Sequence, residues 1–360
     1  MADFFEFKNK TNIKENLEGS SAWTSPSNIA LIKYWGKKDI QIPKNPSLSF
    51  TLSKCITNCK LKFKFSSLIK EFKFQLYFEG KREVSFETKM NVFFQRIKPY
   101  CSFLNNVELI LETTNTFPHS SGIASSASAY SAISLCLMDI EKSLNPTISN
   151  EFFFKKASFL SRLGSGSACR SILGPVVIWG KNNIFHDSSN HYGSRFSNEL
   201  HDIFKNYNDS ILLVDKAQKQ VSSSVGHDLM NDHFFSKNRL SQVDSNLTLM
   251  CDVLSNGNID QFIKIVELEA LTLHAMMMTS NPYFILLKPN TLNIINKVWD
   301  YRKSSGSKVC FTLDAGANIH LLYPNNEYDK IQSFIKKTLS VFCYNGEFIN
   351  DQVGYGPNKL

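Results

Sequence analysis

The sequence lacks the common signatures for binding nucleotides and nucleic acids. It contains no Gly-Lys-Ser/Thr run and no Gly-x-Gly-x-x-Gly run, which excludes a Walker A loop and the dinucleotide fingerprint. No run of basic residues is interleaved with aromatic residues, so nucleic acid is not an expected partner. A nucleotide site in this chain must therefore use a different motif.

The sequence also lacks segments that would direct the chain to a membrane. Residues 1–19 mix charged and aromatic side chains, without the continuous apolar core of a signal peptide. The most apolar stretch, residues 129–138, is too short to span a bilayer and is followed by Asp139. We therefore expect a cytoplasmic protein without a membrane partner.

The cysteines show no pattern of a metal site. There are eight, with no Cys-x-x-Cys pair and no histidine at zinc-site spacing. This distribution predicts reduced, mostly buried thiols at Cys55, Cys59, Cys101, Cys136, Cys169, Cys251, Cys310 and Cys343.

What the sequence does have is length, apolar content and a surplus of positive charge. Its 360 residues, 42% of them hydrophobic, allow a substantial core in one large domain or two smaller ones. Lysine and arginine outnumber aspartate and glutamate by 40 to 32, a formal charge of +8 spread along the chain. Such a surplus suits anionic partners such as phosphorylated metabolites.

The most informative stretch is residues 117–140, FPHSSGIASSASAYSAISLCLMDI. Small residues fill most of its first half, and Ile133, Leu137 and Ile140 follow at helical spacing. The pattern predicts a tight turn that opens a helix. A phosphate fits there because a helix N-terminus exposes unpaired N–H groups and the positive end of the dipole. A serine N-cap before a helix that packs through small residues is the alternative.

The segment of residues 25–38 is predicted to form a short strand that breaks at Gly36. This leaves Lys33, Lys37 and Lys38 near the end of a strand. Lysines beside a turn can bind an anion, and solvated lysines on an edge strand are the alternative.

Two further stretches place a charged residue among small ones. Residues 164–171, GSGSACRS, surround Arg170 with glycine and serine, and its guanidinium can form a forked pair with a carboxylate or phosphate. Residues 313–318, LDAGAN, place Asp314 at the end of an apolar strand, where a ligand could approach. The alternatives are an exposed arginine in a glycine-rich connection and an aspartate turn in a hairpin.

The hydrophobic pattern predicts a mixed α/β chain that begins with a polar arm of about 20 residues. Strands are predicted at residues 48–54, 58–65, 72–78, 84–86, 107–112, 175–179, 211–214, 309–313, 319–323 and 342–349. Helices are predicted at residues 90–104, 151–163, 234–255, 260–278, 290–303 and 327–341. The polar, aperiodic residues 186–208 indicate the crossing into a second domain.

Four of these stretches, taken together, resemble a known family. They are NIALIKYWGK (28–37), SSGIASSAS (120–128), GSGSACRS (164–171) and LDAGAN (313–318), with VSSSVGH between the last two. In this order they are similar to the mevalonate diphosphate decarboxylases of the GHMP kinase superfamily, and the resemblance extends over most of the chain. The ordered set is much more specific than any one stretch.

The resemblance implies a fold and a reaction. The fold is of the α/β (α+β) class: a GHMP kinase fold with a domain like the second domain of ribosomal protein S5, residues 1–205, and a ferredoxin-like α/β sandwich, residues 206–360. The active site lies between them. The reaction is the ATP-dependent, Mg²⁺-assisted conversion of mevalonate 5-diphosphate to isopentenyl diphosphate, CO2, ADP and phosphate, in the mevalonate pathway of isoprenoid biosynthesis.

The resemblance also implies roles for individual residues. Asp314 matches the catalytic aspartate, Lys33 the lysine beside the reacting hydroxyl, and Arg170 the arginine that binds the substrate carboxylate. The predicted substrate-binding residues are Asn28, Tyr34, Lys37, Ser167, Arg170 and Ser222. The predicted ATP phosphate-binding residues are Ser120, Ser121, Gly122, Ala124, Ser125 and Ser126, with Ser126 also assigned to Mg²⁺.

The sequence departs from the family pattern in two places. The loop reads HSSGIASSAS where many members have a Thr-Ala-Ala-Gly-Leu run, and His227 stands where methionine is frequent. Neither departure removes a catalytic residue, and the roles of His119 and His227 remain open.

Three alternatives to this function remain. Within the superfamily, the chain could be a mevalonate-phosphate kinase or a decarboxylase of the monophosphate. A kinase that stops at phosphorylation is expected to lose part of the set of Asp314, Lys33 and Arg170, which is complete here. A basic, non-catalytic S5-like protein could instead bind nucleic acid, but it would need a clustered basic face. A homodimer is expected by default.

Overall fold

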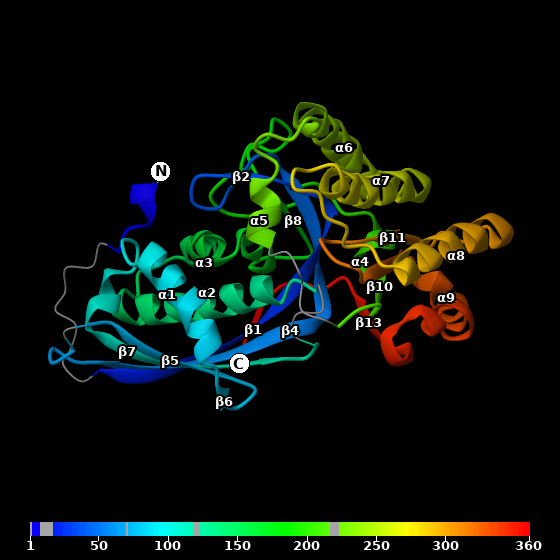
Figure 1. The fold of residues 1–360 in the computed structure, drawn as a ribbon. Coiled ribbons are helices and arrows are strands. Elements are labelled where there is room, and N and C mark those ends of the chain that lie inside the picture. Colours follow the sequence, from blue (N-terminus) through cyan, green and yellow to red (C-terminus); the bar gives the residue numbers. More distant parts are fainter. Residues whose placement is uncertain (1, 8–16, 70, 119–122, 217–222) are drawn as a thin grey trace.

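The computed structural model describes residues 2–7, 17–69, 71–118, 123–216 and 223–360. A large sheet carries helices on one face, and a smaller antiparallel sheet with helices of its own adjoins it (Figure 1). The chain is therefore of the mixed α/β class, as predicted.

The strands have the following bounds. They are β1 (Glu18–Ile32), β2 (Lys37–Lys38), β3 (Ile42–Pro43), β4 (Ser47–Phe65), β5 (Lys73–Phe78), β6 (Lys81–Arg82), β7 (Val107–Asn115), β8 (Val176–Trp179), β9 (Ser194–Arg195), β10 (Asn208–Leu212), β11 (Cys310–Thr312), β12 (Ile319–Tyr323), β13 (Phe348–Gln352) and β14 (Asn358–Lys359).

The helices have the following bounds. The α-helices are α1 (Val84–Ile97), α2 (Ser125–Leu144), α3 (Asn150–Gly164), α4 (Asp202–Lys205), α5 (Ser223–Asp228), α6 (Ser236–Asn256), α7 (Ile259–Met278), α8 (Pro289–Ser305) and α9 (Tyr328–Phe334). The short 3-10 helices are η1 (Ala2–Phe5), η2 (Ser102–Asn106), η3 (Gly166–Ser171), η4 (Asn325–Glu327), η6 (Ser340–Phe342) and η7 (Tyr344–Gly346), and η5 (Ile335–Leu339) is a π-helix.

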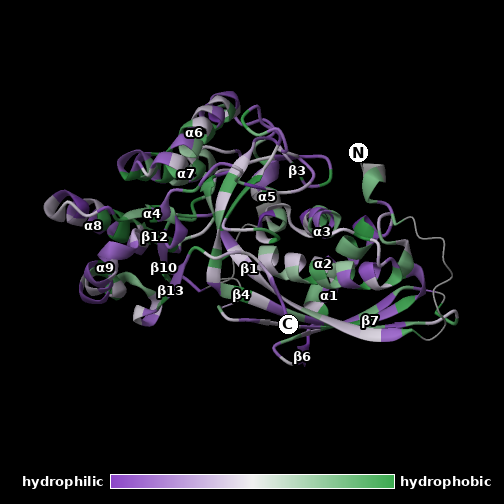
Figure 2. Cartoon of the chain, turned by 180° about the vertical axis from the view of Figure 1, so that it is seen from behind, coloured by the Kyte–Doolittle hydropathy of each residue, from purple (hydrophilic) through white to green (hydrophobic). Residues whose placement is uncertain are grey.

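The large sheet has the order β14-β1-β4-β7-β5-β6, and β8 joins it through β4. β1 and β4 pair antiparallel along most of their length, whereas β5 and β7 are parallel. Along β7, Leu109 and Leu111 are buried and Glu108 is exposed, the alternation of a strand with one covered face. Figure 2 shows apolar and polar residues mixed along these strands. Helices α1, α2 and α3 cover the apolar face.

The small sheet has the order β11-β12-β10-β13 and is antiparallel throughout. One hydrophobic cluster joins the two sheets, because Leu31 of β1 and Phe50 of β4 belong to the same cluster as Ile211 of β10 and Phe262 of α7. The end of β1 is therefore fixed against the helices of the second half.

The end of the chain returns to the large sheet. The Asp351 carboxylate accepts the backbone N–H groups of residues 53–55 at 2.6 to 2.9 Å, and β14 pairs with β1 through Trp23 and Lys359. The end of the chain thus binds to the first half at two places, through Asp351 and through β14.

Some predicted elements have different bounds in the structure. The two strands predicted at 48–54 and 58–65 are one continuous strand, β4. The strand predicted at 84–86 is wrong, because these residues begin α1, where the Glu83 side chain accepts the N–H of Ser85 at 3.3 Å. The helix predicted at 90–104 ends at Ile97 and is followed by a 3-10 helix.

The two ends of the chain also differ from the prediction. The polar arm is wrong for residues 2–5, which form η1, and Phe5 is only 1% exposed because it packs in the core. The strand predicted at 342–349 begins only at Phe348, after two 3-10 helices. The prediction for residues 2–5 failed because burial of an aromatic ring stabilises this segment despite its neighbouring charged residues.

The expected cysteine chemistry is confirmed: all eight thiols are free and buried. In the described part of the chain, none of the helices combines the length and the apolar character that crossing a membrane requires.

Candidate active site

The site is built around the residue that follows β1. Lys33 is buried, with 2% of its side chain exposed, and its Nζ atom lies 2.8 Å from Oδ1 of Asp314. Asp314 follows β11 and keeps 29% of its side chain exposed. The alternative of a solvated edge-strand lysine is therefore wrong for Lys33, and its ammonium meets a carboxylate that a ligand can reach.

Burial and mutual attraction act on the pKa values of both members of this pair. Burial lowers the pKa of the Lys33 ammonium, although Asp314 and Glu269 counteract this. Burial also acts to raise the pKa of the Asp314 carboxyl, but attraction to Lys33 and its hydrogen bond outweigh it, so this pKa lies below the ordinary value. Asp314 is thus an ionised but weakly basic carboxylate.

Arg170 lies in η3, just after α3, and is 3% exposed. Its Nη1 donates to the Ser47 hydroxyl at 2.5 Å and its Nε to the Asn28 side-chain oxygen at 3.3 Å. Asn28 in turn donates to the Ser171 hydroxyl at 2.8 Å and to the Ser167 carbonyl at 3.2 Å. These contacts exclude an exposed arginine and fix the plane of the guanidinium.

The ring of Tyr34 lies beside this arginine. The Arg170 Cζ atom is 5.5 Å from the ring centroid, and Trp179 meets the ring edge-on at 4.8 Å. A Cβ atom at Gly166 would lie 2.8 Å from Trp179 and 3.0 Å from the Tyr34 hydroxyl. Glycine is therefore required at this point of the GSGSACRS stretch.

His227, to which the sequence assigned no role, belongs to the same cluster. Its ring stacks on that of Tyr34 at 4.6 Å, and its Nδ1 accepts the Gly36 N–H at 3.0 Å. Because Nδ1 is the acceptor, the proton of the neutral imidazole is on Nε2. Nearby, burial lowers the pKa of Lys37 to about 8.

The Ser-rich stretch opens α2 as predicted. Ala124 has left-handed backbone angles (φ 43°) at the N-cap, and no side chain caps the helix. Ser27 donates to the Ile123 carbonyl at 2.6 Å and holds the turn, while the exposed Ser126 lies 3.3 Å from the Ser165 hydroxyl. The Ala127 N–H donates to the Ala124 carbonyl at 2.8 Å, which leaves the N–H groups of Ser125 and Ser126 at the start of α2 for a ligand.

Several predicted residues lie outside the described part of the chain. These are His119, Ser120, Ser121, Gly122 and Ser222. Of the predicted ATP-binding residues the structure places Ala124, Ser125 and Ser126, and of the predicted substrate-binding residues it places all except Ser222.

Two residues of this region were missed from the sequence. Glu269 of α7 accepts the Lys33 backbone N–H at 2.8 Å, and His274 lies with Nε2 3.2 Å from the Asp314 carbonyl oxygen. The available signal for Glu269 was its position on the apolar face of α7, where a carboxylate is out of place unless it has partners.

The described part of the chain contains no preformed cluster of metal ligands. Among the described residues, no group of three or more histidine, cysteine, aspartate or glutamate side chains could hold an ion. Mg²⁺ usually takes one or two protein oxygens together with phosphates of the substrate, and the hydroxyl groups at the start of α2 fit that arrangement.

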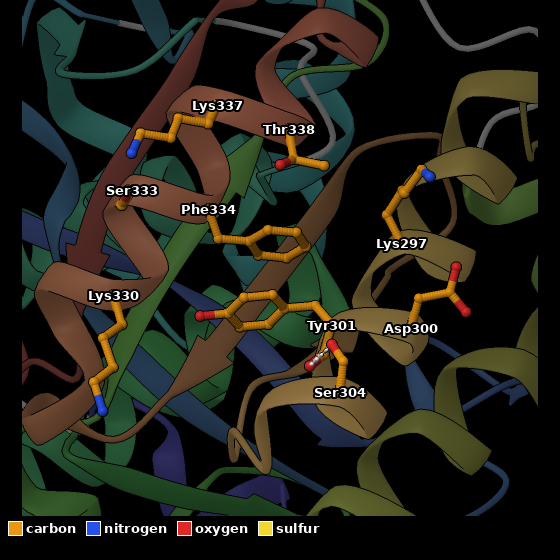
Figure 3. Close-up of a pocket in the computed structure, with 9 residues that line it drawn as sticks. All are labelled: Lys297, Asp300, Tyr301, Ser304, Lys330, Ser333, Phe334, Lys337 and Thr338. Atoms are coloured by element: carbon orange, nitrogen blue, oxygen red, sulfur yellow. Dashed lines mark hydrogen bonds between the residues drawn. The ribbon is translucent and has the colours of Figure 1, made fainter.

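Two cavities lie apart from this cluster. One of about 470 Å³ is shown in Figure 3, where the rings of Tyr301 and Phe334 stack at 4.0 Å between α8 and α9. The other, of about 620 Å³, is lined by residues that include Phe72, Phe94 and Leu104. The predicted site residues line neither of them.

Known family models match both halves of the chain. Residues 25–190 match the model of the diphosphomevalonate decarboxylase-like N-terminal domain, and residues 210–354 match that of the mevalonate 5-diphosphate decarboxylase C-terminal domain. The diphosphomevalonate decarboxylase of Aspergillus fumigatus is 27% identical over 331 residues, covering 88% of this chain and 80% of that protein.

Solved structures have the same fold. Mevalonate diphosphate decarboxylase from Staphylococcus aureus superposes with a TM-score of 0.81 at 26% identity, covering 96% of this chain and 98% of that one. MDDEF in complex with MVAPP, AMPPCP and magnesium has a TM-score of 0.80 at 24% identity, with coverage of 96% and 99%. The fold is thus the predicted GHMP kinase fold. Because both domain models match in order and together cover most of its length, the chain belongs to the diphosphomevalonate decarboxylase family.

Proposed function

We propose that the chain converts mevalonate 5-diphosphate and ATP to isopentenyl diphosphate, CO2, ADP and phosphate. The observation that carries this proposal is the ion pair between the buried Lys33 and the partly exposed Asp314, which come from opposite halves of the chain. Family membership supports the same reaction.

The first step requires activation of the C3 hydroxyl of the substrate. Asp314 would orient this hydroxyl and accept its proton as the oxygen bonds to the γ-phosphorus of ATP. Since the pKa of Asp314 is lowered, the proton moves late, when the oxygen has become more acidic. Lys33 stabilises the negative charge that develops there.

The second step breaks a carbon–carbon bond. The electron pair of the bond to the carboxylate becomes the new double bond, CO2 leaves, and the phosphate departs from C3. Arg170 would bind the carboxylate and orient it, because Asn28 and Ser47 fix its guanidinium from behind.

The diphosphate of the substrate is assigned to the cluster beside Arg170. Tyr34 and Lys37 follow β1, Ser167 lies in η3, and the predicted Ser222 lies outside the described residues. Lys37 supplies positive charge and Tyr34 an O–H donor whose pKa is raised by burial, so it stays protonated.

The start of α2 is assigned to the phosphates of ATP. The N–H groups and hydroxyls of Ser125 and Ser126 would donate to phosphate oxygens. Bound Mg²⁺ would neutralise phosphate charge, and Ser126 is the protein oxygen proposed to approach it. MDDEF, which has the same fold, was solved in complex with AMPPCP and magnesium, and this supports ATP and Mg²⁺ as ligands without identifying the residues that bind them.

The proposal is tested by following ADP and CO2 separately. Purified protein is given ATP and Mg²⁺ with either mevalonate 5-diphosphate or mevalonate 5-phosphate, and with neither as the background control. Equal ADP and CO2 from the diphosphate are expected. ADP without CO2 would favour the kinase alternative. Turnover of mevalonate 5-phosphate but not of the diphosphate would favour a decarboxylase of the monophosphate. A homodimer and a cytoplasmic location remain proposals, which sedimentation and cell fractionation would test.

A further inference from the structure

The backbone of Lys33 is held on both sides by buried side chains. Its N–H donates to Glu269 Oε2 at 2.8 Å, and its carbonyl accepts from Arg239 Nη2 at 3.0 Å and from Asn45 Nδ2 at 3.1 Å. Lys33 follows directly after β1, whereas Arg239 and Glu269 lie on α6 and α7. The helices of the second half therefore hold the peptide groups on either side of the Lys33 side chain.

Glu269 has a complete set of donors. Arg239 donates to Oε1 at 2.8 Å and to Oε2 at 2.5 Å, and Asn246 donates to Oε1 at 2.6 Å. With the Lys33 N–H, each carboxylate oxygen receives two hydrogen bonds. Glu269 has no exposed surface and Arg239 has 2%.

A buried ion pair of this kind adds little to stability. Desolvation of the two charges offsets most of their attraction, and packed apolar side chains often serve as well. Its value lies in geometry: two helices and one strand can pack in only one register if four directed hydrogen bonds are to form at Glu269.

The pair also affects the charge of Lys33. The charged groups that act on this side chain are Asp314, Glu269, Arg170 and Asp209, whereas Arg239 contacts the Lys33 backbone carbonyl. Burial lowers the pKa of Lys33, while Asp314 and Glu269 act against this. Without the Glu269 charge, the ammonium would lose its proton at a lower pH.

We propose that Glu269 and Arg239 are positioning residues that fix the Lys33 backbone, so that its ammonium meets Asp314 and stays charged during turnover. This inference rests on the role proposed above for Lys33. Residues of α6 and α7 would then contribute to the chemistry, although none of the sequence motifs includes them.

The test is Glu269→Gln, which keeps the shape of the side chain and removes its charge. We expect kcat to fall about tenfold or more, because a displaced catalytic group loses alignment. We also expect the alkaline limb of the kcat–pH profile to move to lower pH, with the KM for ATP nearly unchanged.

A matched control lies two residues away on the same helix. Glu267 is also buried, and among the described residues its carboxylate accepts hydrogen bonds from Arg302, at 2.6 Å, and from Trp299 rather than from Lys33. Glu267→Gln should lower thermal stability and leave the alkaline limb in place. A purely structural role for Glu269 would give the same result in both variants.

An alkaline limb in Glu269→Gln that coincides with the parent's would overturn the inference. If this variant does not fold, Arg239→Met with Glu269→Met removes both charges together, and parent-like kcat in the double variant would also overturn it. Lys33→Met distinguishes failure of the proposed role of Lys33 from failure of the positioning role of Glu269. Parent-like turnover there would remove the proposed role of Lys33 itself, whereas loss there without a shift in Glu269→Gln would overturn only the positioning role.

Discussion

Tyr34 and His227 stack with their ring centroids 4.6 Å apart and their planes 18° from parallel. Burial, with the charges of Lys37 and Arg170 nearby, holds the pKa of His227 well below 6.5. The imidazole is therefore neutral in the folded protein. Because its Nδ1 accepts the Gly36 N–H, protonation at that atom would break this contact.

The first prediction follows from this neutral imidazole. Below about pH 6.5 the unfolded chain binds a proton at His227 that the folded chain does not, so the free energy of unfolding falls as pH drops, by up to about 1.4 kcal/mol per pH unit from this group. His227→Phe keeps the stack and should reduce that slope. Denaturant unfolding from pH 7.5 to 5 would measure it, and identical slopes in parent and variant would contradict the prediction.

The second prediction concerns Lys37, whose pKa is lowered to about 8 by burial. The side chain loses its charge as pH rises through this value, so the KM for mevalonate 5-diphosphate should increase above about pH 8. Lys37→Arg keeps its charge and should show a flatter profile between pH 7 and 9. Steady-state kinetics across this range would decide, and an equally steep rise in the arginine variant would refute the role of Lys37.

The third prediction tests the start of α2. Ser126→Ala removes an exposed hydroxyl and should raise the KM for ATP about fivefold, as expected for loss of one hydrogen bond worth about 1 kcal/mol. Ser143→Ala, near the other end of the same helix, is the control and should leave ATP kinetics unchanged. The assignment of Ser126 fails if both variants show the same KM for ATP.

A fourth prediction concerns the two-pronged hydrogen bonding of the Arg170 guanidinium. Arg170→Lys keeps the charge but cannot hold Asn28, Ser47 and a carboxylate together, so kcat/KM for the substrate should fall by about 10- to 100-fold. Arg302→Lys alters an arginine of the second half that pairs with Glu267 and should affect stability rather than kcat/KM. Full activity in Arg170→Lys would mean that the forked geometry is not needed.

Local patterns predicted much of the fold. The strand at residues 319–323 has the predicted bounds, and α6, α7 and α8 lie within two residues of theirs, because hydrophobic periodicity and caps are local signals. The strand predicted at residues 84–86 failed because Glu83 caps a helix there. Phe5 was misjudged because only the folded chain shows what it packs against.

The candidate site was predicted from motifs, and its contacts were not. The order of four stretches pointed to Lys33, Arg170 and Asp314, but no local rule brings together residues 281 apart in sequence, as in the pair of Lys33 and Asp314. Glu269 occurs in none of the motifs, although a carboxylate on an apolar helix face was a usable signal. What the sequence could not give was tertiary geometry.

The last prediction is for Asp314→Asn, which keeps the shape of the side chain and removes the base. If Asp314 accepts the proton of the C3 hydroxyl, kcat should fall by about 10²- to 10⁴-fold. A structural aspartate would instead affect stability, because the Lys33 ammonium would lose the carboxylate 2.8 Å away. Both effects are separated by measuring kcat on protein shown to be folded and able to bind ATP. Turnover within a few-fold of the parent on such material would rule out the catalytic role, since loss of the ion pair alone would act on the folded fraction and not on the chemical step.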